Sequence, residues 1–239
     1  MMKKKHISNI VLLSIVTIIV LVSACSSSNG TASHTKDTTK PDGSLPTLQI
    51  NDMWIQETTI DQEQYTLKAQ VIGEEVINNK SCYKIQGTVD PPILGTSKNS
   101  LLYLGKATMD IVQREFTDTI NGHPYTVVTT YSYTHSSTPY PYEVGKEWQT
   151  SKVAYTTITS MGESETNTEK TITNSKVERT ETITVTAGTF ECFVITTYDE
   201  QMNAISTSWS SADTKHTSVK NIDHETGAIS ELISYDLSL

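Results

Sequence analysis

Alternation of apolar and polar side chains is the pattern that most constrains the fold of this chain. From Tyr65 to Val71 every odd position is apolar and every even position is polar, and residues 125–133 place three tyrosines and Val127 on one face. Successive side chains of an extended strand point to opposite faces, so this period of two predicts half-buried strands. Similar segments, rich in Thr, Tyr, Val and Ile, predict further strands over residues 53–60, 82–89, 148–159, 180–186, 190–198, 204–210, 216–222 and 228–236.

Two segments are less clear. Apolar residues of segment 101–116, Leu104 and Ile111 among them, follow helical spacing and allow a helix, but Gly105 in the middle favours a strand. Segment 160–180 has few apolar residues and predicts a long exposed hairpin or a mobile loop. Many antiparallel strands without a convincing helix indicate an all-β meander, which has to curl or be covered to protect its edges.

The two halves of the β body, residues 53–135 and 144–236, resemble each other faintly. Aligning Cys82 with Cys192 also matches an aromatic residue and an isoleucine, and a tryptophan opens each half. The halves are either weak pseudo-repeats or two meanders that look alike because both are rich in Thr and Tyr. The two cysteines form a disulfide in one interpretation and are separate half-buried thiols in the other.

The N-terminus has the composition of an export signal. Three lysines at 3–5 precede an apolar stretch from 10 to 22, and small residues then lead to Cys25. Residues 20–25, Val-Leu-Val-Ser-Ala-Cys, resemble the lipobox of bacterial lipoprotein signal peptides. The resemblance implies cleavage before Cys25, attachment of palmitate or a similar acyl group, and a position on the extracytoplasmic face of the cell membrane, or on the outer membrane if the cell is Gram-negative. An uncleaved transmembrane anchor is the alternative.

This interpretation divides the chain into a signal peptide (1–24), a flexible Ser/Thr-rich tether (25–47) and a β domain (48–239). The tether has few bulky apolar side chains to offset the entropy of ordering, and its root-mean-square reach is roughly 25 Å. Removal of the signal peptide takes away three lysines and no acids, so the net charge changes from −9 to −12. An acidic surface repels phosphate backbones, so we expect no nucleic-acid partner.

Two turn motifs resemble those of uncharacterised exported bacterial proteins. Residues 141–148 (Pro-Tyr-Glu-Val-Gly-Lys-Glu-Trp) fit P-x-x-V-G-K-x-W, and residues 185–190 (Val-Thr-Ala-Gly-Thr-Phe) fit V-x-A-G-x-F. These proteins are similar to a family described only as a domain of unknown function, which implies an open, curled half-barrel related to envelope lipoprotein carriers and receptors. The resemblance covers 140–236 well and 50–135 weakly. The sequence departs from the family pattern after Trp209, where the family tends to have a Gly next to an apolar residue and this chain has Ser-Ala-Asp-Thr-Lys-His.

The function implied by this resemblance is binding without catalysis. We expect a lipid-anchored protein that holds a hydrophobic ligand or an envelope partner on its concave face. Tyr131, Tyr133, Trp148 and Tyr155 are candidates to line that face, unless they serve core packing and cross-strand pairing. The alternatives are a structural or interaction lipoprotein without a small-molecule ligand, and a cell-surface hydrolase.

Motifs of catalysis are missing from the sequence. It contains no Gly-x-Ser-x-Gly, His-Glu-x-x-His, Cys-x-x-Cys or P-loop pattern. The densest group of potential metal ligands is His216, Asp223, His224 and Glu225, and the last three are more typical of a polar hairpin turn. We therefore expect no catalytic residue, no metal and no cofactor.

Overall fold

The computed structural model describes residues 41–92, 97–120, 122–135 and 140–238, and most of them belong to one antiparallel sheet. Each strand pairs with the next along the chain, and a short 3-10 helix, η2 (Ala212–Thr214), precedes the last two strands. The strands are β1 (Met53–Ile60), β2 (Glu63–Ile77), β3 (Lys80–Asp90), β4 (Asn99–Gly105), β5 (Ile111–Ile120), β6 (His123–His135), β7 (Glu147–Ser160), β8 (Glu163–Val185), β9 (Gly188–Tyr198), β10 (Ala204–Ser210), β11 (Ser218–Asp223) and β12 (Ile229–Asp236).

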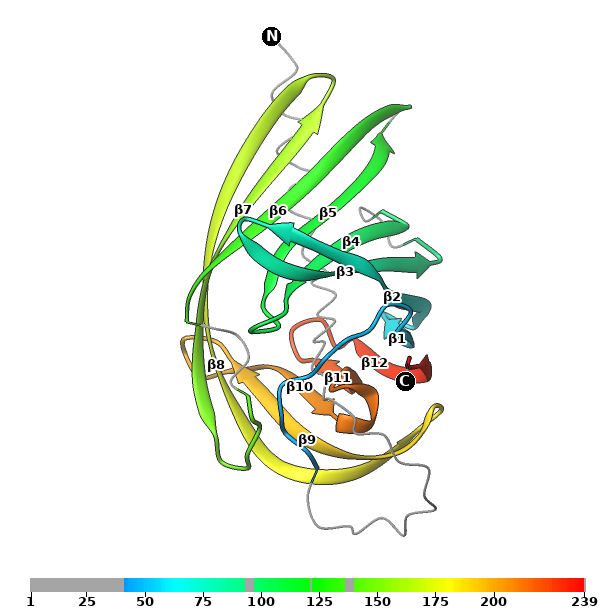
Figure 1. Cartoon of the computed structure of the whole chain (residues 1–239), viewed down its shortest axis with the longest axis vertical. Coiled ribbons are helices and arrows are strands. Elements are labelled where there is room, and N and C mark those ends of the chain that lie inside the picture. Colours follow the sequence, from blue (N-terminus) through cyan, green and yellow to red (C-terminus); the bar gives the residue numbers. More distant parts are fainter. Residues whose placement is uncertain (1–40, 93–96, 121, 136–139, 239) are drawn as a thin grey trace.

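The sheet closes into a barrel because β12 pairs with β1 (Figure 1). Their antiparallel register runs from Met53 opposite Asp236 to Thr59 opposite Ile229. The prediction of an all-β antiparallel meander is confirmed, whereas the prediction of an open half-barrel is wrong. Closure pairs the first and last strands, which would otherwise expose the backbone of two sheet edges.

The strand bounds follow the alternation closely. The expected strands 53–60 and 204–210 are β1 and β10, residue for residue. Segment 101–116 forms no helix: it contains β4, a turn that begins after Gly105, and the start of β5. Segment 160–180 belongs to a long hairpin, which was one of the two predictions for it. In this hairpin β7 and β8 pair along their length, from Ser160 opposite Glu163 near the turn to Glu147 opposite Lys176. This hairpin and the β5–β6 hairpin extend past the other strands at the upper end of the barrel in Figure 1.

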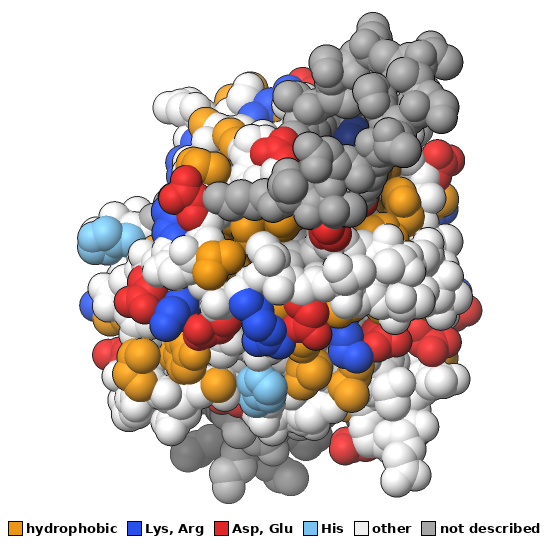
Figure 2. Space-filling model, turned by 90° about the horizontal axis from the view of Figure 1, so that it is seen from below, with side chains coloured by type: hydrophobic (Ala, Val, Ile, Leu, Met, Phe, Trp, Pro, Cys, Tyr) orange, Lys and Arg blue, Asp and Glu red, His pale blue; other side chains and the backbone are white. Residues whose placement is uncertain are grey.

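Several cations on the outer surface of the barrel lie next to an acidic side chain. Lys220 Nζ lies 2.7 Å from Glu231 Oε1, and an Arg179 guanidinium nitrogen lies 2.6 Å from Glu181 Oε2. Figure 2 shows acidic and basic side chains alternating in a band across the lower face, with hydrophobic side chains in separate groups. None of the helices among the described residues is long and apolar enough to cross a membrane.

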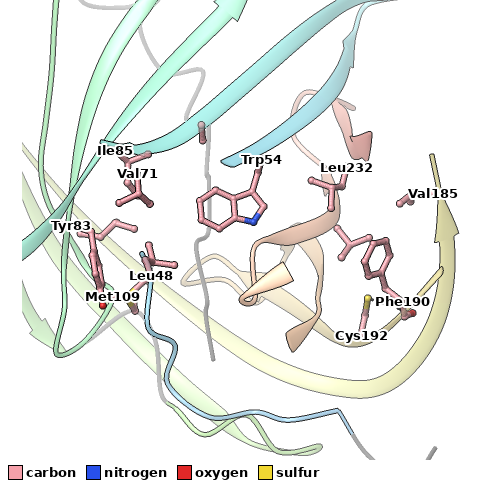
Figure 3. Packing of buried hydrophobic residues seen from close by; sticks show 13 residues of the cluster. Leu48, Trp54, Val71, Tyr83, Ile85, Met109, Val185, Phe190, Cys192 and Leu232 are labelled. Atoms are coloured by element: carbon pink, nitrogen blue, oxygen red, sulfur yellow. Dashed lines mark hydrogen bonds between the residues drawn. The ribbon is translucent and has the colours of Figure 1, made fainter. Parts of the chain in front are cut away.

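The apolar core fills the lower part of the barrel around Trp54 (Figure 3). Trp54 lies between two groups of side chains, with Val71 and Ile85 on one side and Leu232 and Phe190 on the other. The cluster of buried residues comprises Leu48, Trp54, Ala69, Val71, Tyr83, Ile85, Leu104, Met109, Val185, Phe190, Cys192, Val219 and Leu232.

The segment that contains η2 and leads into β11 packs inside the barrel, and we call residues 211–218 the plug. Ser211, Thr214, His216, Thr217 and Ser218 are all buried. The indole Nε1 of Trp54 donates to the carbonyl of Thr214 (3.0 Å), which fixes the plug against β1. The plug contains the Ser-Ala-Asp-Thr-Lys-His stretch that departs from the family pattern, so this departure lies inside the barrel.

The N-terminal end of the described chain lies against the barrel, and we call residues 41–52 the strap. The backbone N–H of Tyr142 donates to the carbonyl of Gly43 (2.7 Å), and a Cβ on Gly43 would lie 2.3 Å from the carbonyl oxygen of Tyr142. Residues 41–47 of the expected tether are therefore packed rather than free, because glycine allows this close backbone approach. The rest of the tether and the expected signal peptide lie outside the described residues.

Candidate functional site

A cavity of about 50 Å³ lies inside the barrel beside Trp54. The strand register explains it, because Ala69 pairs with Gly87 and Gly87 pairs with Ser100. Three small residues therefore lie side by side on the inner face of β2, β3 and β4. A Cβ on Gly87 would come within 2.8 Å of the Ser100 hydroxyl, so this close contact depends on glycine. A cavity of this size holds a few water molecules or a small chemical group.

Apolar side chains form most of the wall around these small residues. Leu67 pairs with Val89, and Ile85 pairs with Leu102, and all four line the cavity. Lys68 also borders the cavity, but it alternates with the inward Leu67 and Ala69. Its backbone therefore belongs to the wall while its side chain leaves from the opposite face.

Arg114 is the cation on the inner wall. It pairs with Leu102 on the neighbouring strand, so its side chain shares the inner face with the apolar wall. Burial lowers the pKa of its guanidinium, which nevertheless stays charged at every physiological pH. None of the described acidic residues forms an ion pair with Arg114. Arg114 thus lacks the acidic partner that Lys220 and Arg179 have on the outer surface.

The plug contributes a second polar group to the cavity. Thr217 is 1% exposed and lines the cavity, and its hydroxyl has no hydrogen-bond partner among the described residues. Gln56 on β1 lines the same space and donates its side-chain amide to the carbonyl of Ser218 (2.7 Å). A buried hydroxyl without a hydrogen-bond partner destabilises the folded protein. A ligand that accepts a hydrogen bond from it would remove this cost.

A second cationic group, on β7, lies on the inner face outside the cavity wall. Lys152 Nζ lies 5.8 Å from the centre of the Tyr131 ring. Burial lowers the pKa of Lys152 and raises the pKa of Tyr131, and the nearby charge of Glu169 opposes the shift at Lys152. Thr129, which pairs with Arg114, is bonded to Thr156 (3.1 Å) on the next strand, so the interior between the two cations is polar.

The four aromatic candidates do not line one concave face. Tyr131 points inward, whereas Tyr155 follows its partner Ala154 by one residue and points outward, with 45% of its surface exposed. Trp148 stacks on Tyr142 at a centroid distance of 6.2 Å, beside a separate core cluster. Sequence patterns missed Arg114 because it lies in the segment whose spacing was ambiguous. Its place two residues before the apolar Phe116, at the same parity, was the available signal.

The two cysteines of the β domain are free, so the structure agrees with the interpretation of two separate thiols and not with that of a disulfide. Cys82 belongs to a small cluster with Tyr103 and Val112, whereas Cys192 belongs to the main core. Burial raises the pKa of both thiols, that of Cys192 to about 12. Cys25, the expected acylation site, lies outside the described residues.

The four potential metal ligands of the sequence do not come together in the structure. His216 is buried in the plug, whereas Asp223 caps an exposed turn by accepting the backbone N–H groups of Glu225 (2.9 Å) and Thr226 (2.8 Å). His224 meets the hydroxyl of Thr207 at 2.9 Å. In the part of the chain that the structure describes, no group of three or more His, Cys, Asp and Glu could hold a metal ion.

The fold and the cavity define a closed antiparallel barrel with a partly polar interior. Comparison with known families gives a match, and the matched residues contain both turn motifs of the sequence. Residues 106–222 match the DUF3108-like family, from the turn after β4 to β11. The matched part includes Arg114 and Thr217 but not the small residues of β2–β4. Gly145 lies in a turn and Gly188 begins β9 directly after one, and both have a positive φ, which explains their glycines. No curated protein matches the chain.

Two solved structures are similar. One is described as an exported protein with a YmcC-like fold from Bacteroides fragilis NCTC 9343; it is 10% identical, with a TM-score of 0.40 over 79% of this chain and 97% of that chain. The other, described as a lipoprotein from Parabacteroides distasonis ATCC 8503, is 13% identical, with a TM-score of 0.31 over 79% of this chain and 96% of that chain. Similarity at this level carries nothing about what this chain binds.

Proposed function

We propose that the chain is a lipid-anchored, extracytoplasmic binding protein without catalytic activity, and that it holds a hydrophobic ligand inside its barrel. The cavity beside Trp54 carries the proposal, because apolar side chains such as Leu67 and Leu102 surround a space that the described residues leave empty. The site lies inside the barrel, since closure removes the expected concave face. Its volume of about 50 Å³ is far below that of a pocket for a complete drug-sized molecule, so only one end of the ligand fits.

The proposed anchor at Cys25 places this cavity close to a membrane. The residues between Cys25 and the strap allow the barrel to stay near the lipids that would supply an apolar ligand. Tethering raises the effective concentration of two bound partners without any new contact. Metabolic labelling with a clickable fatty acid tests the anchor: the wild-type chain should be labelled and Cys25→Ser should not. A wild-type chain without label would contradict the proposal.

Filling the cavity tests the ligand. Ala69→Leu adds a bulky side chain to the inner row of small residues, whereas Gln70→Leu makes a similar change at the next position, on the other face of β2. Native mass spectrometry of the full-length protein released from its own membrane should show a bound small molecule with wild type and Gln70→Leu, and much less with Ala69→Leu. Equal occupancy in all three proteins, or none in wild type, would contradict a ligand in this cavity.

A second candidate function is docking of an envelope partner on the long hairpins. Exposed hydroxyl pairs run across their outer face, with Thr117 and Thr126 at 3.1 Å and Thr159 and Ser164 at 2.9 Å. The register also places Thr126 opposite Thr159, so the row crosses four strands. Cross-linking in intact cells from a reactive group at Thr159 would identify such a partner, and a single reproducible adduct would favour this function.

A further inference from the structure

We infer that the ligand end held in the cavity is anionic, a carboxylate or a phosphate, and that Arg114 binds it with help from Thr217. This inference rests on the proposed function and adds the chemical class of the ligand. It would assign a recognition role to the guanidinium on β5 and to a hydroxyl of the plug.

The charge of the cavity is opposite to that of the protein. The chain carries 27 acidic against 18 basic residues, yet among the described residues no Asp or Glu lines the cavity, and Arg114 is the one inward cation there. The guanidinium of Arg179, in contrast, has Glu181 beside it on the outer surface. A partly buried cation without a counter-charge is unfavourable, and a bound anion would supply the missing partner.

A second, independent observation comes from Thr217. Its hydroxyl is almost fully buried, lines the same cavity, and has no partner among the described residues. A threonine hydroxyl can donate one hydrogen bond, and carboxylate and phosphate oxygens accept such bonds from hydroxyl and guanidinium groups alike. The cavity thus combines two donors that an anion could satisfy.

The rest of the wall distinguishes an amphiphile from a free inorganic anion. Leu67, Val89, Ile85 and Leu102 would contact the first methylene groups next to an anionic head, whereas they offer nothing to a free ion. A volume of about 50 Å³ suits a head of this size better than a complete lipid. We therefore commit to a single-chain amphiphile with an anionic head as the ligand class.

Calorimetric titration of the full-length protein in nanodiscs tests the inference, with empty nanodiscs subtracted. The probes are octanoate, octanol and inorganic phosphate. Octanoate should bind wild type more tightly than octanol does, and Arg114→Gln should weaken octanoate about tenfold or more while leaving octanol unchanged. Arg179→Gln removes an outer guanidinium and should bind octanoate like wild type. Thr217→Val should weaken octanoate by a smaller factor, and circular dichroism checks the fold of each variant.

The outcomes separate the inference from the proposed function. Equal binding of octanoate and octanol, unaffected by Arg114→Gln, would overturn the anionic head and leave a purely apolar ligand. Binding of inorganic phosphate as tight as that of octanoate, and lost in Arg114→Gln, would support the anion site but overturn the amphiphile. Absence of binding by all three probes would overturn the inference together with the proposed ligand site.

Discussion

Asp52 and Lys215 form a buried ion pair that joins the strap to the plug. The Nζ of Lys215 lies 2.7 Å from Asp52 Oδ2, and the Asp52 side chain is completely inaccessible to solvent. The same carboxylate accepts the backbone N–H of Gln49 (2.7 Å) and that of Ser238 (2.8 Å). One carboxylate thus holds together three segments that are distant in sequence: the strap, the plug and the C-terminal residues.

Asp52→Ala should strongly destabilise the barrel. Removing one partner of a buried ion pair leaves the other charge without compensation, which typically costs about 3–5 kcal/mol. Urea denaturation followed by tryptophan fluorescence measures the loss. Asp236→Ala removes an exposed carboxylate from β12 and should change the unfolding free energy by less than about 0.5 kcal/mol. If the two variants are equally stable, the ion pair does not hold the strap and plug.

His216 should make the protein less stable as the pH falls. Burial lowers its pKa to about 4 from an ordinary value of 6.5, so the folded state keeps the ring neutral while the unfolded state protonates it. Stability from this group is fully present above pH 6.5 and is lost as the pH falls toward 4, by about 2–3 kcal/mol. Ser210 Oγ lies 3.2 Å from Nδ1 of the ring, and the charge and the backbone of Asp42 in the strap partly oppose the shift in pKa.

The His216→Asn variant isolates this effect. His216 has a positive φ of 56°, which asparagine tolerates better than most residues. Denaturation at pH 7 and pH 4.5 should show a smaller difference for His216→Asn than for wild type. The exposed His224→Asn serves as the control and should keep the wild-type difference. Identical differences in all three proteins would mean that His216 is not buried in its neutral form.

Cys82 and Cys192 should resist alkylation in the folded protein. The thiolate is the reactive form, and burial raises the pKa of both thiols. Mass spectrometry of their peptides should find no adduct after native treatment with iodoacetamide, and an adduct on both after treatment in urea without reductant. Failure to alkylate either peptide in urea, reversed by a reductant, would instead reveal a disulfide.

The strands were predictable because alternation is a local property of the chain. Each of β1 and β10 can be recognised from its own residues, whatever the rest of the sheet does. Closure was not predictable in this way, since it depends on pairing Met53 with Asp236 across the whole chain. A local pattern indicates that an edge must be protected, but it does not indicate whether the other end of the sheet provides the protection.

The cavity was not predictable for a similar reason. Ala69, Gly87 and Ser100 are unremarkable where they stand in the sequence, and only the register of three strands brings them together. The plug departs from the family pattern in the sequence, but no local feature indicates that Thr217 lines the cavity.

The halves 53–135 and 144–236 contain six strands each, with Cys82 on β3 and Cys192 on β9, the third strand of each half.

Arg114→Met should stabilise the protein while removing its proposed anion site. The side chain is partly buried on an apolar wall beside Leu102 and has no described carboxylate partner, so a neutral side chain of similar length avoids the cost of desolvating a charge. We expect a gain of about 1 kcal/mol in the unfolding free energy without ligand, measured by urea denaturation. Arg179→Met removes an exposed arginine whose ion pair with Glu181 is worth little, and should change stability by less than about 0.5 kcal/mol. A loss of stability in Arg114→Met larger than that in Arg179→Met would show that Arg114 supports the fold, and that its charge is already balanced within the protein.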